Sequence, residues 1–170
     1  MPKKSDQFWM SNAVELAKQA GELGEVPVGA VLILDDKMIG KGRNQSIELN
    51  DPSAHAEIQA LREGASKIGN YRLIGSKIYV TIEPCTMCVG AIIHSRIARV
   101  VFGATEPKAG AVISNNQLFD AECMNHEVSW QGGVLAPQAT ANMQRFGSAL
   151  GKAGQKTVQK AGQQGAQFSS

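Results

Sequence analysis

Apolar and polar positions alternate along this chain with two different periods, and each period predicts a type of element. Over residues 6–24, apolar side chains recur at spacings of three and four, as on the buried face of an amphipathic helix. Residues 26–34 are rich in branched apolar side chains and are followed by Asp35-Asp36 and a second short apolar run near Met38. This pattern is typical of a β-hairpin. The chain is therefore predicted to begin with a helix and a hairpin.

The middle of the chain alternates between helical and strand patterns. Apolar residues fall on one helical face over 55–68, after a turn-forming segment at 50–53. Residues 77–82 are predicted as a strand, 85–94 as a helix and 98–102 as a strand. Such an alternation is typical of a βαβ unit with parallel strands. We therefore expect an α/β protein.

The composition changes near residue 150 and divides the chain into a body and a tail. A chain of 170 residues has room for one domain with a substantial core. Its 43% of hydrophobic residues exclude wholesale disorder. Residues 151–170 are dominated by Gly, Ala, Gln and Lys and bury too little to offset their ordering entropy. We therefore predict one domain over 1–150 and a flexible, basic tail over 151–170.

The N-terminus shows no targeting signal. No apolar run of signal-peptide character follows the opening Met-Pro-Lys-Lys, and no stretch is long enough to span a bilayer. The three cysteines make a poor disulfide framework, which fits a reducing compartment. We therefore expect a cytoplasmic protein with no membrane partner. The formal net charge of +2 is only a weak indication of an anionic partner.

Two short motifs carry the candidate chemistry. His-Ala-Glu at 55–57 opens one predicted helix, and Pro-Cys-Thr-Met-Cys at 84–88 opens the next. Cysteines at positions i and i+3 lie on one face of a helix, so both sulfurs can bind one ion, and the proline suits the first helical position. The candidate ligands are His55, Cys85 and Cys88. Three such ligands leave one position for water, which is typical of a catalytic zinc site.

A zinc ion in this setting would provide a nucleophile from water. Zinc lowers the pKa of a bound water toward about 7, so hydroxide becomes available near neutrality. His-x-Glu followed by Pro-Cys-x-x-Cys is the known signature of zinc-dependent nucleobase deaminases. Glu57, two residues beyond His55, is our candidate for the group that moves the water proton to the ring and to the departing ammonia. The expected cofactor is one zinc ion per subunit.

Several further segments resemble bacterial tRNA-specific adenosine deaminases. They lie at 25–31, 54–58, 70–73, 82–88, 94–97 and 101–104, within a resemblance over about residues 9–135. The resemblance implies a zinc deaminase domain with a three-layer α/β/α, cytidine-deaminase-like fold around a five-stranded mixed sheet, and a homodimer. It also implies that adenosine becomes inosine at the wobble position, in the anticodon stem-loop of an arginine tRNA. DNA is not an expected partner.

The same resemblance implies roles for individual residues. The implied zinc ligands are His55, Cys85 and Cys88. Glu57 is implied to transfer protons, and Asn44 to hydrogen-bond the target base with help from the Ala56 backbone. Glu106 stands where the family usually has Asp, in a loop implied to contact the anticodon ribose and phosphates. Loop bases suit such an enzyme because they are already partly unstacked.

The chain departs from the family at its C-terminus. In relatives the last helix carries an aromatic pair followed by clustered arginines, whereas this chain has Gln-Arg-Phe-Gly at 144–147. Lys152, Lys156 and Lys160 recur every four residues and are one candidate replacement for those arginines. Like charges at that spacing oppose a helix unless phosphates neutralise them.

Two alternative functions stay open. The first is deamination of a free base or nucleoside of the guanine or cytosine type. The second is a non-catalytic nucleic-acid-binding module, in which Cys123 or His94 closes a structural zinc site. Glu57 distinguishes the second alternative from an enzyme, because a structural site does not need that carboxylate.

Overall fold

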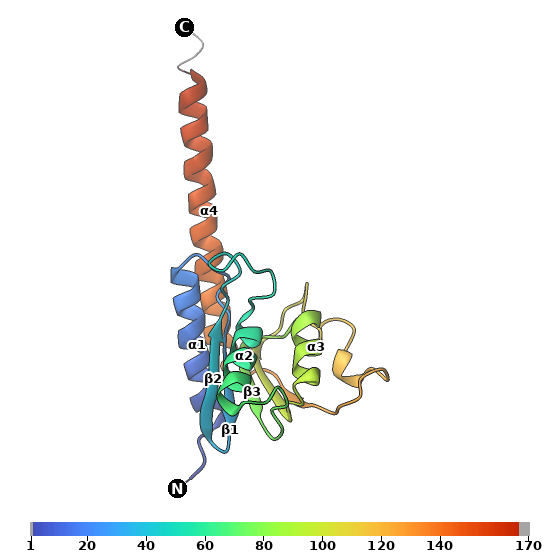
Figure 1. Cartoon of the computed structure of the whole chain (residues 1–170). Helices are drawn as coiled ribbons and strands as arrows, with labels where there is room; N and C mark the ends of the chain where they lie inside the picture. The colour runs from blue at the N-terminus through green and yellow to red at the C-terminus, as the bar shows by residue number, and fades with distance from the viewer. Residues whose placement is uncertain (1, 167–170) are drawn as a thin grey trace.

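The computed structural model describes residues 2–166, and for residues 154–166 it describes the backbone alone. In chain order the elements are α1 (Asp6–Glu22), β1 (Gly29–Leu34), β2 (Lys37–Arg43), α2 (Ala56–Ile68), β3 (Lys77–Ile82), α3 (Thr86–His94), β4 (Arg99–Ala104), the 3-10 helix η1 (Leu118–Asp120), β5 (Ser129–Gln131) and α4 (Ala136–Ala166) (Figure 1). Every helix and strand that the hydrophobic pattern predicted is present, with small shifts at the ends.

The five strands form one mixed sheet in the order β2-β1-β3-β4-β5. β1 pairs with β2 and with β3 in antiparallel fashion, while β3, β4 and β5 run parallel. Because α3 connects the parallel strands β3 and β4, the predicted βαβ unit is confirmed. The carboxyl ends of β3 and β4 meet at one edge, where the Glu83 N–H donates a hydrogen bond of 2.8 Å to the Ala104 carbonyl.

Helices cover both faces of the sheet and make three layers. Successive residues of a strand point to opposite faces. On one face Val31 of β1 is buried in a cluster with Met10 of α1. On the other face Leu32 of β1 is buried with Ala60 of α2 and Ile92 of α3. Figure 1 shows α1 and α4 on one side of the sheet and α2 and α3 on the other. The predicted three-layer fold with a five-stranded mixed sheet is confirmed.

A close approach of two backbones holds α2 against β2. A Cβ atom at Gly42 would overlap the carbonyl oxygen of Ala56 and would lie 2.7 Å from the backbone nitrogen of Ala60. A side chain at position 42 would therefore push the first turn of α2 away from the sheet. This glycine thus allows the first turn of α2 to pack directly on β2. His55 is the N-cap of that helix.

The start of α3 differs from the prediction. The sequence pattern places Pro84 in the first helical position, but α3 begins at Thr86. Cys85 is its N-cap, in extended backbone with a ψ of 173°. Cys85 also forms an isolated antiparallel β-bridge with Gly110, a distant residue that local sequence rules do not consider. The bridge keeps Cys85 extended, so the helix starts later than predicted.

The long helix α4 crosses the predicted domain boundary at 150 and continues through Ala166. In Figure 1 its C-terminal part extends away from the sheet. The division into 1–150 and 151–170 and the flexibility of the tail stay predictions. Residues 167–170, like the side chains of Lys156 and Lys160, lie outside the described part of the chain. Neither α4 nor any other helix within the described residues is long and apolar enough to cross a membrane.

Candidate metal centre

His55, Cys85 and Cys88 come together from the starts of two helices. His55 is the N-cap of α2, Cys85 is the N-cap of α3, and Cys88 lies in the first turn of α3. The Nδ1 atom of His55 is 3.6 Å from the Sγ atom of each cysteine. All three atoms lie within 4.8 Å of one another. The two sequence motifs therefore form one cluster.

The geometry of the cluster fits a zinc ion. Tetrahedral zinc with its usual bond lengths holds a nitrogen and a sulfur ligand about 3.6 Å apart, and the nitrogen and sulfur atoms here are separated by 3.6 Å. In the part of the chain whose side chains are described, no fourth His, Cys, Asp or Glu joins the group. Cys123 and His94, the candidate fourth ligands of a structural site, are both exposed and outside it. Three protein ligands leave one position open to water.

Hydrogen bonds within the cluster favour a thiolate. The hydrogen bond from Cys88, together with a weaker one from His55, lowers the pKa of Cys85 to about 4 despite its partial burial. The same hydrogen bond to Cys85, assisted by burial, raises the pKa of Cys88. The hydrogen bond with Cys85 also raises the pKa of His55. The cluster thus holds negative charge at Cys85, which suits a cation.

Glu57 lies in the first turn of α2, beside this cluster, and is only 4% exposed. Burial raises the pKa of Glu57 to about 7, and the negative charge of Cys85 acts in the same direction. A carboxyl group with a pKa near neutrality is suited to both accepting and donating a proton at physiological pH. The structure therefore brings a proton-transfer group next to the candidate zinc ligands.

Asn44 connects the end of β2 to the start of α2. Its Oδ1 atom accepts a hydrogen bond of 2.8 Å from the Ala56 N–H, and the residue is 9% exposed. Its Nδ2 atom donates to no other group among the residues whose side chains are described. The amide is therefore fixed at its oxygen and free at its nitrogen. The Ala56 N–H is already engaged by this bond.

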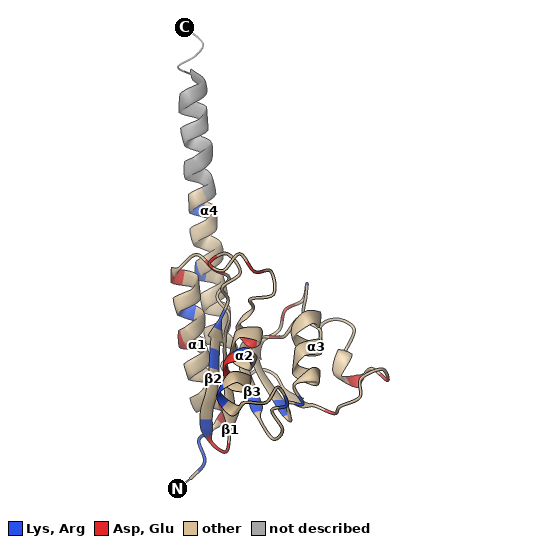
Figure 2. Ribbon diagram, in the orientation of Figure 1, with Lys and Arg blue, Asp and Glu red and all other residues tan. Residues whose placement is uncertain are grey.

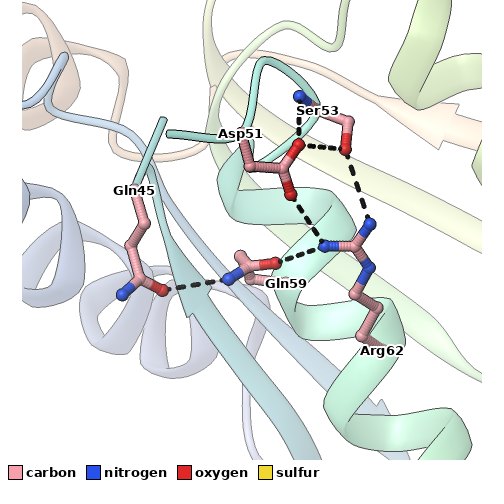
Figure 3. Close-up of polar contacts among 5 residues, drawn as sticks. All are labelled: Gln45, Asp51, Ser53, Gln59 and Arg62. Atoms are coloured by element: carbon pink, nitrogen blue, oxygen red, sulfur yellow. Dashed lines mark hydrogen bonds and ion pairs between the residues drawn. The ribbon is translucent and has the colours of Figure 1, made fainter. Parts of the chain in front are cut away.

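A chain of polar contacts braces the loop between β2 and α2 (Figure 3). Asp51 Oδ1 accepts hydrogen bonds from the backbone N–H of Ser53 at 2.8 Å and from its hydroxyl at 2.7 Å. Arg62 of α2 reaches Asp51 at 3.3 Å and Gln59 at 3.1 Å. Gln59 in turn donates to Gln45 at 3.1 Å. The loop between β2 and His55 is thus attached to α2 at two places, near the first residue of the loop and near its last.

Glu83 lies between β3 and Cys85, is buried, and was assigned no role from the sequence. Its carboxylate accepts hydrogen bonds from the backbone N–H groups of Glu106, Val112, Ile113 and Ser114 and from the Ser114 hydroxyl. Burial acts to raise the pKa of Glu83, but these hydrogen bonds hold the pKa below its ordinary value. The one feature of the sequence that could have pointed to Glu83 is the position of an acidic residue at the end of an apolar strand.

The segment that binds Glu83 also lines a pocket beside Cys85. The pocket has a volume of about 380 Å³, and its lining includes Cys85, Met87, Lys108, Gly110 and Asn115. Glu106 belongs to the same segment but is absent from this lining. Its carboxylate is half-buried and accepts a hydrogen bond of 2.9 Å from the Lys108 N–H.

Charge is mixed over the face of the molecule that Figure 2 shows. Basic residues of α1, β2 and the described part of α4 are interspersed with acidic ones. Up to residue 153, α4 contributes two cations, Arg145 and Lys152. With a net charge of only +2, a polyanion would be attracted by local groups more than by the molecule as a whole.

Known proteins match both the metal cluster and the chain around it. The family model of the cytidine and deoxycytidylate deaminase zinc-binding region matches residues 3–104. The tRNA-specific adenosine deaminase of Haemophilus influenzae is 54% identical over 142 residues, which cover 83% of this chain and 82% of the relative. The corresponding protein of Bacillus subtilis is 38% identical over 141 residues, with coverages of 83% and 88%.

Solved structures share the fold at very different levels of identity. One, from a study of A-to-I editing by tRNA:A34 deaminases at the wobble position of transfer RNA, is 41% identical with a TM-score of 0.78 and covers 79% of this chain and 98% of its own. Guanine deaminase from Nitrosomonas europaea has a TM-score of 0.73 over 87% of each chain but only 20% identity, which shows the fold alone. Sequence identity, rather than fold, separates these groups, and by that measure the chain belongs to the family of tRNA-specific adenosine deaminases.

Proposed function

We propose that this protein deaminates adenosine to inosine at the wobble position of a tRNA anticodon, with an arginine tRNA as substrate. The observation that carries the proposal is the convergence of three zinc-type ligands beside the buried carboxyl of Glu57, in a chain 54% identical to a tRNA-specific adenosine deaminase. The reaction is a hydrolysis, in which water replaces the amino group at C6 of adenine and ammonia is released.

We infer that His55, Cys85 and Cys88 hold the metal, one zinc ion per subunit. When bound, zinc supplies a water molecule whose pKa is lowered toward neutrality. Because His55 and Cys85 are only half-buried whereas Cys88 is buried, the accessible side of the cluster is the side of His55 and Cys85. We expect the base to approach from there.

Glu57 is the proposed catalytic acid and base. Its carboxylate takes a proton from the attacking water and gives it to the adjacent ring nitrogen as the C6–O bond forms. The second water proton then passes through the same carboxyl to the amino group as the C6–N bond breaks. Ammonia leaves, inosine remains, and Glu57 returns to its starting state. A pKa of about 7 suits a group that must accept and donate in one cycle.

Asn44 and the 105–117 segment are the proposed substrate contacts. The Ala56 N–H fixes the Asn44 oxygen, so the free Nδ2 atom is oriented to donate to an acceptor nitrogen of the purine. Glu106 is proposed to contact the anticodon ribose, where a carboxylate can accept a hydrogen bond from a hydroxyl. A homodimer in the cytoplasm completes the proposal, and both features have their support in the family resemblance.

Inosine formation on a synthetic arginine tRNA anticodon stem-loop tests this function. We expect the zinc-loaded protein to form inosine and a chelator to abolish the activity until zinc is restored. Glu57→Ala should bind zinc but lose at least about a hundredfold in rate, the usual scale of general acid–base catalysis. Glu63→Ala is the matched control, because Glu63 is an exposed carboxylate of the same helix.

Three results would contradict the proposal in different ways. Inosine formation by Glu57→Ala at the normal rate would remove Glu57 from the mechanism. Turnover of free adenosine, guanine or cytosine without turnover of the stem-loop would assign the protein to a small-molecule deaminase. Zinc binding without activity on any of these substrates would favour a non-catalytic module.

A further inference from the structure

Residues 105–117, called the Glu83 loop below, connect β4 to η1 and contain no helix or strand. One side chain outside the loop engages much of its backbone. The Oε1 atom of Glu83 accepts hydrogen bonds from the Glu106 N–H at 3.1 Å and from the Ser114 hydroxyl. The Oε2 atom accepts, at 3.0 Å each, the N–H groups of Val112, Ile113 and Ser114.

The Glu83 carboxylate accepts backbone hydrogen bonds of this loop that, in a sheet, a neighbouring strand would accept. Three successive N–H groups that point at one oxygen form an anion-binding nest. Hydrogen bonds to a charged acceptor are about twice as strong as neutral ones. Glu83 is 3% exposed, so water does not compete freely for either partner. Without the carboxylate, the donors of the loop would have to find other acceptors, and the loop would lose this conformation.

The fit between Glu83 and the loop depends on a glycine. A Cβ atom at Gly110 would overlap the carboxyl carbon of Glu83. The adjacent Ala111 N–H donates a hydrogen bond of 2.8 Å to the Pro84 carbonyl, and Gly110 itself bridges to Cys85. The loop is therefore fastened to three consecutive residues, the last of which is a candidate zinc ligand.

This attachment places the Glu83 loop beside Cys85, where both line one pocket. The lining includes Cys85 and Met87 from the start of α3, and Lys108, Gly110 and Asn115 from the Glu83 loop. Glu83 is not in this lining, but its carboxylate joins the loop to the segment that carries Cys85. A change at Glu83 would move the Glu83 loop relative to Cys85.

We propose that Glu83 is a positioning residue that holds the Glu83 loop at the rim of the metal centre in the conformation that receives the RNA. The identity of the substrate rests on the function proposed above, whereas the anchoring of the loop does not. The hydrogen bonds of its carboxylate are all made with the loop. Glu83 acts through the loop, so its loss should weaken substrate binding more than it slows the chemical step.

Two variants and one control separate this role from a general loss of stability. Glu83→Gln keeps the shape of the side chain but turns an amide donor toward the N–H groups of the loop. Gly110→Ala keeps the Glu83 side chain, but its Cβ atom would overlap the carboxyl group of Glu83 and would lie 2.6 Å from the carbonyl oxygen of Glu106. Glu63→Gln is the control, since Glu63 also accepts a backbone hydrogen bond, from Lys41 at 2.8 Å, on an exposed face of α2.

Amide hydrogen exchange of peptides from 105–117 measures directly whether Glu83 holds the loop. Zinc content and stem-loop kinetics measure how the loss of this contact affects the metal centre and substrate binding. We expect exchange in this segment to accelerate at least about tenfold in Glu83→Gln and in Gly110→Ala, with zinc content unchanged. The KM for the stem-loop should rise about tenfold, while kcat changes less than about threefold.

The outcomes are distinguishable. Wild-type exchange rates across the loop in Glu83→Gln would show that Glu83 does not hold the loop. Faster exchange with an unchanged KM would show that the position of the loop does not matter for substrate binding. Either result overturns the proposal. Loss of zinc from Glu83→Gln would show that Glu83 supports the metal ligands instead, which also overturns the proposal. If the wild-type protein forms no inosine, the proposed function fails, but the exchange data still decide whether Glu83 anchors the loop.

Discussion

Backbone groups hold the polar side chains that are buried around the metal centre. Asn44 is fixed by the Ala56 N–H, and Glu83 by the N–H groups of a loop. A buried polar group without a partner costs about 1–3 kcal/mol. At Asn44 the residue type therefore matters twice, once for the stability of the fold and once for the direction in which the free amide nitrogen points.

Substitutions of Asn44 should separate these two roles. In Asn44→Asp, the carboxylate still accepts the Ala56 N–H but has no donor for the base, so we expect little loss of stability and a decrease in kcat/KM of about ten- to a hundredfold. Asn44→Ala leaves the Ala56 N–H unpaired and should lower the free energy of unfolding by about 1–3 kcal/mol. Urea denaturation and stem-loop kinetics measure both quantities. A wild-type kcat/KM for Asn44→Asp would contradict the proposed contact with the base.

The candidate zinc ligands and Glu57 could be named from the sequence because two local motifs contain them. A histidine two residues before a glutamate and a pair of cysteines three apart have meaning before any fold is known. Glu83 could not be assigned in this way. Its hydrogen-bond donors lie 23 to 31 positions further along the chain, in a loop without a periodic pattern.

At the scale of elements, helices and strands could be predicted where apolar residues recur with a regular period. They could not be predicted where contact with a distant segment changes the local conformation. The run at 77–82 and the helix after it follow from their apolar periods. The first residue of α3 does not, because the bridge from Gly110 keeps Cys85 extended. The composition after residue 150 predicts that little is buried, but Ala, Gln and Lys are also good helix formers, and α4 continues there to Ala166.

Two glycine substitutions should have opposite effects on stability. Gly42→Ala places a Cβ atom against the backbone of Ala56 and Ala60 in α2. We expect the free energy of unfolding to fall by about 2–3 kcal/mol and zinc affinity to fall as well, because the start of α2 carries His55. Gly147→Ala is the control. Its Cβ would meet nothing, and a helical alanine should stabilise α4 by up to about 1 kcal/mol.

Urea denaturation and zinc titration of both variants check this prediction. A stable Gly42→Ala protein with normal zinc affinity would show that α2 can shift on the sheet without disturbing the metal centre. A marked loss of stability in Gly147→Ala would mean that α4 is not helical at that position in solution.

At the scale of the whole molecule, one polar cluster joins the first helix to three strands. Asp6 of α1 accepts hydrogen bonds from the Tyr79 hydroxyl of β3 at 2.8 Å and from Arg99 of β4 at 2.9 and 3.0 Å. Arg99 also donates to Gln131 of β5 at 2.7 Å. The cluster therefore connects the N-terminal helix to β3, β4 and the edge strand β5.

The cluster predicts a pH-dependent contribution to stability. The hydrogen bonds from Arg99 lower the pKa of Asp6 despite the opposing effect of burial. The stabilisation is therefore fully present above the unfolded pKa of about 3.9 and is lost as the pH falls through the lower, folded pKa. We expect Asp6→Asn to lower the free energy of unfolding by about 1–3 kcal/mol at neutral pH. The difference from wild type should shrink below about pH 3.9. Urea denaturation across this range tests it, and a difference independent of pH would refute it.

The N-caps of α2 and α3 have a consequence for anyone who redesigns this protein. Ser5 caps α1 with its side chain, whereas His55 and Cys85 make no side-chain cap bond. Ser, Thr, Asp or Asn would stabilise each of those helix starts by about 1 kcal/mol. A sequence optimised for thermal stability alone would therefore replace both residues and keep the fold. It would yield a robust protein that no longer binds the metal, so thermostability screens on this scaffold need a selection for zinc.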